Sequence, residues 1–247
     1  MDRGRRGVFV TGTDTGVGKT MISAALLLGL RGRGREVGAM KPVETGCPAD
    51  GRVLVPSDGV FLRETAGMDD SLDLIAPSRF APPLAPLVAA EQEGTSVDLD
   101  SIMDAYRKLS EKYDFLVVEG AGGLLVPLRD GAVSCPPSAF RRPSPYFVCD
   151  LIREMGLPAV VVARPALGTI NHTLLTVDHA LREGVTVLGV IVNQCGPPGD
   201  TLAEKTNPDV LRRLCPVPVL GTFPYSASLS PEAIREAAER CIDFDPF

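Results

Sequence analysis

Short apolar runs, bounded by glycine, proline or charged residues, recur along this chain of 247 residues. Runs of this length, rich in valine, are typical of strands that are buried on both faces of a sheet. They predict strands at residues 8–10, 36–40, 114–118, 158–163, 185–193 and 218–222.

The stretches between these runs have the periodicity of helices. In residues 98–112, the apolar side chains fall on one face at Leu99, Ile102, Met103, Tyr106 and Leu109. Further helices are predicted from the residues after Thr20 to about Leu30, from Ser57 onward, and over 146–155, 169–182, 201–214 and 231–241. We expect Ser57 or Asp58, Thr169 or Asn171, and Ser230 as the N-cap residues.

Strands and helices alternate through the chain, and the sequence contains no internal repeat. Such alternation predicts an α/β fold, with a mostly parallel sheet and helices on both faces. We expect one domain over residues 1–247.

The first predicted strand leads into a glycine-rich loop, GTDTGVGKT at residues 12–20, and a predicted helix follows at once. This order is the context of a phosphate-binding loop, in which glycines let backbone N–H groups approach phosphate oxygens. Lys19 would neutralise terminal phosphates, and the Thr20 hydroxyl would coordinate Mg²⁺. The spacing departs from the usual motif, because Thr13 stands where its first glycine is expected. The context still favours a fold like that of the P-loop NTPases.

Polar residues also follow two other predicted strands. Lys41 follows the strand at 36–40, and Glu119 follows the strand at 114–118. Because open parallel sheets bind ligands at the carboxyl ends of their strands, we expect both side chains near the glycine loop. A carboxylate in this place is typical of an acid that associates with Mg²⁺.

Composition narrows the range of functions. A net charge of −6 does not favour extensive nucleic-acid binding, and no apolar run approaches the length of a membrane span. The six cysteines are scattered without a C-x-x-C pair, which is typical of reduced thiols in a cytoplasmic protein. His172 and His179 lie seven residues apart, and no carboxylate or cysteine spacing joins them into a metal site.

Residues 132–145, AVSCPPSAFRRPSP, differ in character from the rest of the chain. They hold four prolines and adjacent arginines, a composition typical of a flexible surface segment. The predicted elements on either side are complete without them. We therefore expect an insertion that adds little to the core.

Taken together, these motifs resemble the dethiobiotin synthetase family. The matching pieces are GTDTGVGKT (12–20), KPVETG (41–46), SD (57–58), VEGAGGLLVPL (118–128), LGTINHTLLT (167–176), VNQ (192–194) and GTFPY (221–225). The resemblance implies a homodimeric enzyme of biotin synthesis with ATP and Mg²⁺ as cofactors. Such enzymes close a ureido ring on 7,8-diaminononanoate with CO₂, through a carbamate and a carbamic–phosphoric anhydride. The family is normally shorter where this chain has residues 132–145.

The resemblance also implies roles for individual residues. Lys19 and Lys41 are the implied catalytic residues, and Thr20, Asp58 and Glu119 are the implied Mg²⁺ ligands, directly or through water. The nucleotide is implied to lie against Thr13, Gly16, Val17, Gly18, Lys19, Thr20, Met21, Asp58, Glu119, Gly120, Ala121, Gly122, Asn193, Gln194, Pro224, Tyr225 and Ser226. The diamine is implied to contact Thr15, Lys41, Thr45, Gly168, Thr169 and Asn171. The last three of these open a predicted helix, which in the family meets the substrate carboxylate across the dimer interface.

Two other kinds of protein share this loop. A cobyrinate or cobyrate amide synthase activates its substrate with ATP in a similar way, but usually carries a glutamine-hydrolysing domain for which this chain has no room. A ParA/MinD-like ATPase switch carries a second lysine early in the loop, where this sequence has Asp14. The sequence also has no basic amphipathic tail, so we expect neither nucleic acid nor a membrane as a partner.

Overall fold

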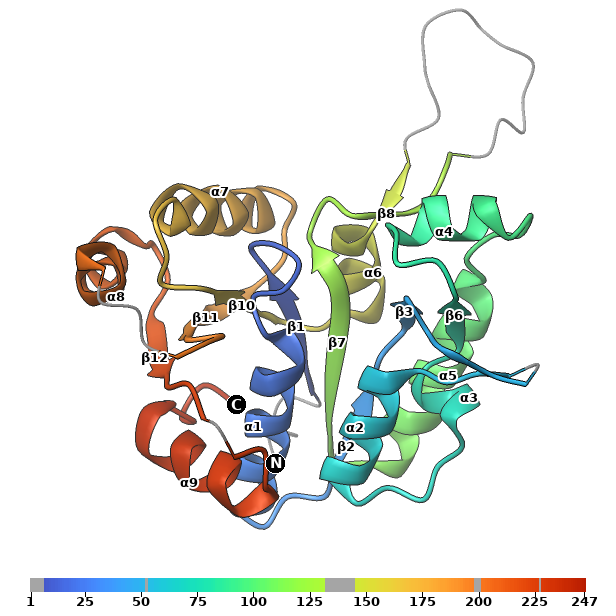
Figure 1. Cartoon of the computed structure of the whole chain (residues 1–247), viewed down its shortest axis with the longest axis horizontal. Helices are drawn as coiled ribbons and strands as arrows, with labels where there is room; N and C mark the ends of the chain where they lie inside the picture. Colours follow the sequence, from blue (N-terminus) through green and yellow to red (C-terminus); the bar gives the residue numbers. More distant parts are fainter. Residues whose placement is uncertain (1–6, 52, 132–144, 198–200, 227) are drawn as a thin grey trace, which may run out of the picture.

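The computed structural model describes residues 7–51, 53–131, 145–197, 201–226 and 228–247. Within them, six parallel strands form a central sheet in the order β12–β11–β10–β1–β7–β2 (Figure 1). The strands are β1 (Gly7–Gly12), β2 (Val37–Met40), β7 (Phe115–Gly123), β10 (Ala159–Ala163), β11 (Val187–Asn193) and β12 (Val219–Phe223). Each corresponds to a strand predicted from an apolar run, and most of their residues are buried.

Helices cover both faces of this sheet, which confirms the predicted α/β architecture (Figure 1). On one face, α1 (Lys19–Arg31) contacts α2 (Ser57–Ala66) and α9 (Pro231–Cys241). The connections that cover the opposite face contain α5 (Leu99–Lys112), α6 (Val148–Met155), α7 (Thr169–Arg182) and α8 (Leu202–Leu214). The short helices α3 (Leu72–Ile75) and α4 (Pro86–Gln92) belong to the connection between β2 and α5. None of the helices in the described part of the chain has the length and apolarity needed to cross a membrane.

Short strand pairs lie beside the central sheet. β3 (Val43–Thr45) pairs in parallel with β6 (Ser78–Phe80), and β4 (Ala49–Asp50) pairs with β5 (Val53–Leu54). β8 (Pro127–Arg129) pairs with β9 (Tyr146–Phe147), so the two ends of the expected insertion lie side by side. Residues 132–144 of that insertion lie outside the described residues.

Several predicted element boundaries are wrong, by two residues at the end of β1 and at the starts of β11 and α6, and by five residues at the end of β7. The helix expected from Tyr146 begins at Val148, because Tyr146 and Phe147 form β9. The strand expected to end at Val118 continues to Gly123, because β1 pairs alongside it through Val10–Glu119 and Gly12–Gly123. Glu119 therefore lies inside β7 and does not follow it.

The predicted N-caps are confirmed at one helix and wrong at two. The Ser230 hydroxyl accepts the N–H of Ala233 (3.3 Å) at the start of α9. The N-cap position of α2 is Pro56, so neither Ser57 nor Asp58 caps that helix. The N-cap of α7 is Gly168, whose φ of 92° lies in the left-handed region that favours glycine over threonine or asparagine.

The parallel arrangement brings the carboxyl ends of β1, β2, β7, β11 and β12 to one edge of the sheet (Figure 1). The register between strands is specific there, because Met40 pairs with Val118 and Val10 pairs with Glu119. As a result, the glycine loop after β1, Lys41 after β2 and Glu119 on β7 meet at this edge.

Candidate active site

A cavity of about 890 Å³ lies at the carboxyl edge of the sheet. Its walls come from the glycine loop, the segment after β2, the start of α2 and the ends of β7, β11 and β12. Most of the sequence-predicted site residues line it: Thr15, Gly16, Gly18, Lys19, Thr20, Met21, Lys41, Thr45, Asp58, Glu119, Ala121, Gly122, Asn193, Gln194, Pro224, Tyr225 and Ser226. The fold thus collects side chains that are up to 211 residues apart in sequence (Thr15 to Ser226).

The glycine loop forms the turn expected of a phosphate cradle. Gly16 and Gly18 have φ values of 74° and 83°, which glycine adopts without strain. Lys19 is buried at the first position of α1, and its Nζ donates to the carbonyl of Asp14 (3.1 Å) across the loop. Burial, followed by the charge of Lys41, lowers the pKa of Lys19 to about 8. The loop therefore presents an ammonium group and the N-terminus of α1 to the cavity, an arrangement that binds anions.

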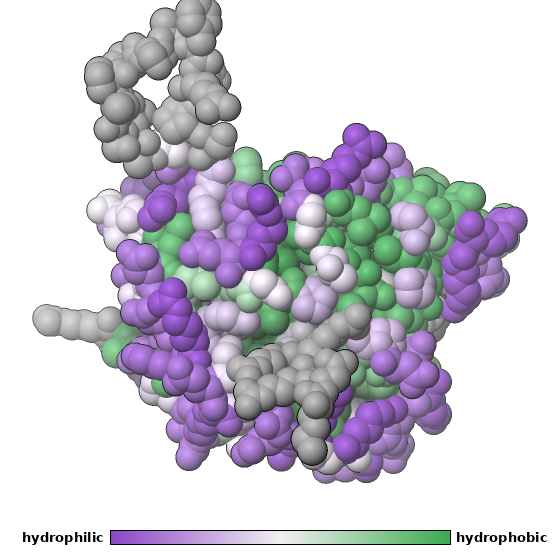
Figure 2. Space-filling model, turned by 180° about the vertical axis from the view of Figure 1, so that it is seen from behind, coloured by the Kyte–Doolittle hydropathy of each residue, from purple (hydrophilic) through white to green (hydrophobic). Residues whose placement is uncertain are grey.

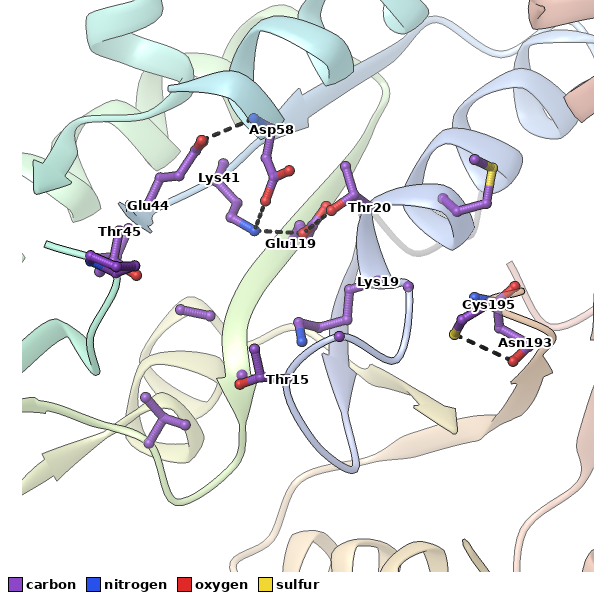
Figure 3. Close-up of a pocket in the computed structure, with 18 of the residues that line it drawn as sticks. Thr15, Lys19, Thr20, Lys41, Glu44, Thr45, Asp58, Glu119, Asn193 and Cys195 are labelled. Atoms are coloured by element: carbon purple, nitrogen blue, oxygen red, sulfur yellow. Dashed lines mark hydrogen bonds and ion pairs between the residues drawn. The ribbon is translucent and has the colours of Figure 1, made fainter. Parts of the chain in front are cut away.

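A cluster of charged side chains faces this loop (Figure 3). The buried Lys41 Nζ lies 2.8 Å from Asp58 Oδ2 and 2.5 Å from Glu119 Oε1. The same Glu119 oxygen accepts the hydroxyl of Thr20 (2.9 Å). Burial opposes the charge of Lys41, but the carboxylates of Glu119 and Asp58 outweigh it and raise the pKa of Lys41 above its usual value. Lys41 is therefore charged at neutral pH.

The residues that could hold a metal ion are Thr20, Asp58 and Glu119. Glu119 Oε2 is fully buried and has no hydrogen-bond partner among the described residues. An unpartnered carboxylate oxygen is costly to bury, so a ligand for it is expected. The hydroxyl and the two carboxylates supply the hard oxygen ligands that Mg²⁺ prefers, and such sites keep several waters. In the described part of the chain, no three His, Cys, Asp or Glu side chains lie close enough together to bind a metal ion. A Mg²⁺ site at Asp58 and Glu119 would therefore need Thr20, water or a bound substrate as further ligands.

Glu44 is a further site residue, for which the sequence predicts no role. It lies on β3, lines the cavity and is buried. Its two carboxylate oxygens accept the backbone N–H groups of Asp58 and Gly59, each at 2.9 Å, at the start of α2. Burial raises the pKa of Glu44, although these two N–H groups act in the opposite direction. In the sequence, only the position of Glu44 inside KPVETG pointed to the site. Its capping role leaves no local pattern, because Glu44 lies 14 residues before the Asp58 N–H that it accepts.

The proline-rich stretch before α4 also contributes to the site. Pro83, Leu84 and Ala85 line the cavity, together with Pro86 at the first position of α4. Five further residues complete the lining, and the sequence marks none of them: Val43, Val126, Cys195, Phe223 and Leu229. Apolar residues like these resemble ordinary core or loop residues in sequence, so no pattern marked them.

The wall formed by the ends of β11 and β12 contains five of the residues that the resemblance implies for the nucleotide. Asn193 is buried, and its side-chain N–H₂ donates to the carbonyl of Val17 in the glycine loop (3.0 Å) and to Cys195 Sγ (3.4 Å). Gln194, Pro224, Tyr225 and Ser226 lie in the same wall. Asn193 thus braces the phosphate loop from β11, which is separated from β1 by β10 in the sheet.

The remaining predicted residues lie outside the described lining of this cavity. Thr13 instead lines a second cavity of about 310 Å³, together with Leu125, Leu175 and His179. Val17 is fully buried, and Gly120 packs where an added Cβ would lie 2.6 Å from the Phe9 ring. Gly168, Thr169 and Asn171 form the start of α7, where Thr169 is buried and Asn171 is exposed.

The chain is similar to known proteins over nearly its whole length. The family described as "AAA domain" matches residues 6–135 and 143–233. ATP-dependent dethiobiotin synthetase BioD of Thermodesulfovibrio yellowstonii is 48% identical over 241 residues, which cover 98% of each chain. The enzyme of the same name from Bacillus subtilis (strain 168) is 40% identical over 229 residues, 93% of this chain and 91% of the other.

The solved structures support the fold alone. The cell-division ATPase MinD of Pyrococcus furiosus superposes with a TM-score of 0.50 at 17% identity, over 95% of this chain and 97% of the other. Likeness at this identity does not carry the MinD function across, and Asp14 occupies the place of the second lysine in that class. The identity of 40–48% to the synthetases, over more than 90% of each chain, shows the family. The chain belongs to the family of ATP-dependent dethiobiotin synthetases, which are ligases of the P-loop NTPase fold.

Proposed function

We propose that this protein closes the ureido ring of dethiobiotin from 7,8-diaminononanoate, CO₂ and ATP, in biotin synthesis. One observation carries the proposal: Lys19 of the phosphate loop and the Lys41–Glu119–Asp58 cluster face one cavity. That combination suits the transfer of a phosphoryl group to a carboxylate-like acceptor.

In the proposed reaction, one amine of the diamine takes up CO₂ as a carbamate. ATP then phosphorylates the carbamate, and the second amine displaces phosphate from the mixed anhydride. Lys19, at the N-terminus of α1, holds the terminal phosphates of ATP. Lys41 approaches from the opposite wall and neutralises the carbamate and its phosphorylated form. Thr15 and Thr45 line the part of the cavity that we assign to the diamine.

Thr20, Asp58 and Glu119 are the residues proposed to hold Mg²⁺, directly or through water. When bound, Mg²⁺ neutralises charge on the phosphates. The unpartnered oxygen of Glu119 supports this assignment. Gly18, Asn193, Gln194, Pro224, Tyr225 and Ser226 are proposed to surround the nucleotide on its other side.

We further propose a cytoplasmic homodimer in which α7 of one subunit completes the site of the other. Gly168, Thr169 and Asn171 lie outside the cavity of their own subunit, as this arrangement requires. Leu125, Leu167 and Leu175 are each more than half exposed, on or near α7. Hydrophobic surface is also visible in Figure 2, which views the molecule from behind. Exposed leucines of this kind are typical of a subunit interface.

The test is to measure ATP hydrolysis with and without each substrate, and to detect dethiobiotin by mass spectrometry. We expect hydrolysis to require both 7,8-diaminononanoate and CO₂, with one dethiobiotin formed per ATP consumed. Hydrolysis that ignores both substrates would contradict the proposal and would favour an ATPase switch. Hydrolysis that depends on glutamine would favour an amide synthase.

A further inference from the structure

Asp58 is held at two points by one short segment of chain. Lys41, at the start of the segment, binds the Asp58 carboxylate, and Glu44, at its end, accepts the Asp58 backbone N–H. Figure 3 shows the Lys41 ammonium between the Asp58 and Glu119 carboxylates, and the Glu44 carboxylate directed at the backbone nitrogen of Asp58. The side chain of Asp58 is itself 40% exposed, so little packing holds it in place.

The segment that carries Glu44 is anchored to the body of the protein. β3 pairs in parallel with β6, with Glu44 opposite Arg79. In addition, the backbone N–H of Lys41 donates to the carbonyl of Ile75 (2.7 Å). Glu44 therefore acts from a fixed strand upon the start of α2.

The first turn of α2 depends on this distant carboxylate. Its N-cap residue is Pro56, which gives no side-chain hydrogen bond, whereas Asp98 and Ser230 cap α5 and α9 locally. Both Glu44 oxygens are occupied by the N–H groups of Asp58 and Gly59. A buried carboxylate in this place is stabilised by the positive end of the helix. Its two bonds fix the backbone of Asp58 even when the Asp58 side chain changes partner.

We propose that Glu44 is a positioning residue: by capping α2 from β3, it holds Asp58 in reach of the metal–nucleotide complex. This inference rests on the proposed function, in which Lys41 neutralises the carbamate. To do so, the Lys41 ammonium must turn from the Asp58 carboxylate, to which it is bound in this structure. Once Lys41 has turned away, the hydrogen bonds from the N–H groups of Asp58 and Gly59 to Glu44 still fix the backbone of Asp58. Because both Glu44 oxygens are taken, Glu44 is not itself assigned as a ligand.

The test compares Glu44→Ala and Glu44→Gln with Asp98→Ala, which removes the local cap of α5. The Asp98 side chain accepts the N–H of Ser101 (3.0 Å), and Asp98 is not part of the cavity lining described above. Binding of Mn²⁺ in the presence of a non-hydrolysable ATP analogue is followed by electron paramagnetic resonance. We expect Mn²⁺ affinity to fall about tenfold in Glu44→Ala, the effect of losing charge-assisted hydrogen bonds, and to fall measurably in Glu44→Gln. In turnover, the Mg²⁺ concentration for half-maximal rate should rise while the rate at saturating Mg²⁺ changes by only a few-fold.

The control separates positioning from general stability. Asp98→Ala should lower the melting temperature about as much as Glu44→Ala, yet leave Mn²⁺ affinity unchanged. α2 buries Leu62, Thr65 and Ala66, so the Glu44 variants should fold. If Glu44→Ala does not fold, Glu44→Gln, which keeps the side-chain volume, decides the question. Unchanged Mn²⁺ affinity in a folded Glu44 variant would overturn the inference.

This outcome is distinct from failure of the proposed function. If the parent protein binds Mn²⁺ with the ATP analogue but forms no dethiobiotin, the reaction assignment fails. The effect of Glu44 on metal binding is measured without turnover, so it is decided in either case.

Discussion

Lys19 and Lys41 are both buried at the cavity, but their surroundings shift their pKa values in opposite directions. Lys19 has the carbonyl of Asp14 as its hydrogen-bond partner, and burial lowers its pKa. Lys41 lies between two carboxylates that raise its pKa. Lys19 is therefore suited to receive an anion directly, whereas Lys41 must first exchange its carboxylate partners for the substrate. Removal of one lysine should therefore impair a different step from removal of the other.

We expect Lys19→Ala and Lys41→Ala each to reduce turnover by about 10²–10³, the usual cost of losing one preorganised charge in an active site. Lys19→Ala should also lose most of its affinity for ATP, while Lys41→Ala should keep more of it. Calorimetric titration of ATP, alongside turnover, measures both effects. Lys108→Ala, an exposed lysine on α5, is the control. Normal turnover in Lys41→Ala would remove that residue from the active site.

Glu119 allows a sharper test, because its substitution by glutamine keeps the size and removes the charge. We expect Glu119→Gln to need on the order of tenfold more Mg²⁺ and to turn over slowly, since metal affinity depends on the charge of the ligands. Its circular dichroism spectrum should match that of the parent, and Glu111→Gln, an exposed glutamate on α5, should behave like the parent. A lower melting temperature with unchanged Mg²⁺ dependence would instead assign Glu119 to the structure alone.

At the scale of elements, the glycine loop and the end of β11 act as one unit. Asn193 donates to the loop carbonyl of Val17, and Gly18 leaves the space that the Asn193 side chain needs. A Cβ on Gly18 would lie 2.0 Å from Asn193 Nδ2. Two strands therefore define the shape of the phosphate site, although the loop belongs to one of them.

We expect Gly18→Ala to lower ATP affinity by about tenfold or more, because a left-handed backbone that costs about 1–3 kcal/mol for other residues is combined with a clash. Gly156→Ala is the matched control: its φ of 65° is also left-handed, but an added Cβ would meet no described atom within 4 Å. That variant should lose stability and bind ATP normally. Equal ATP affinity in the two variants would mean that Asn193 does not shape the loop. Fluorescence titration with an ATP analogue, together with thermal melting, measures both quantities.

At the scale of the whole molecule, the separation of Asn171 from the cavity is the main consequence of the fold. Asn171 is exposed in the first turn of α7 and lies outside the described lining of the cavity of its own chain. If the homodimer forms as proposed, the substrate carboxylate is bound by the neighbouring subunit. The two subunits should then complement one another when each lacks a different residue.

We expect Asn171→Ala to weaken diamine binding far more than ATP binding. Mixing it with Lys41→Ala, followed by subunit exchange, should restore activity. In the mixed dimer, one site combines Lys41 from its own chain with Asn171 from the neighbour. At full exchange about half of the dimers are mixed, and each has one complete site, so about a quarter of the parent activity is expected. No recovery despite proven exchange would place both residues in the site of one subunit.

The sequence by itself determined the sheet strands, most helices and the chemistry at the ends of strands. These features are local: an apolar run, a glycine loop or a lysine after a strand can be read in a few neighbouring residues. The same holds for the motif residues Lys19, Thr20, Lys41, Asp58 and Glu119, which the cavity brings together as expected. Parallel order alone places the ends of such strands at one edge.

Tertiary structure alone decided what depends on contacts between distant segments. Pairing with β1 extended β7 past Glu119, and a carboxylate from β3 replaced a local cap on α2. The proline-rich stretch became a wall of the cavity through its position beside β3, while the start of α7 lies outside the described lining. Such contacts leave no periodicity or spacing in the sequence, because each is set by the register of strands and the packing of whole elements.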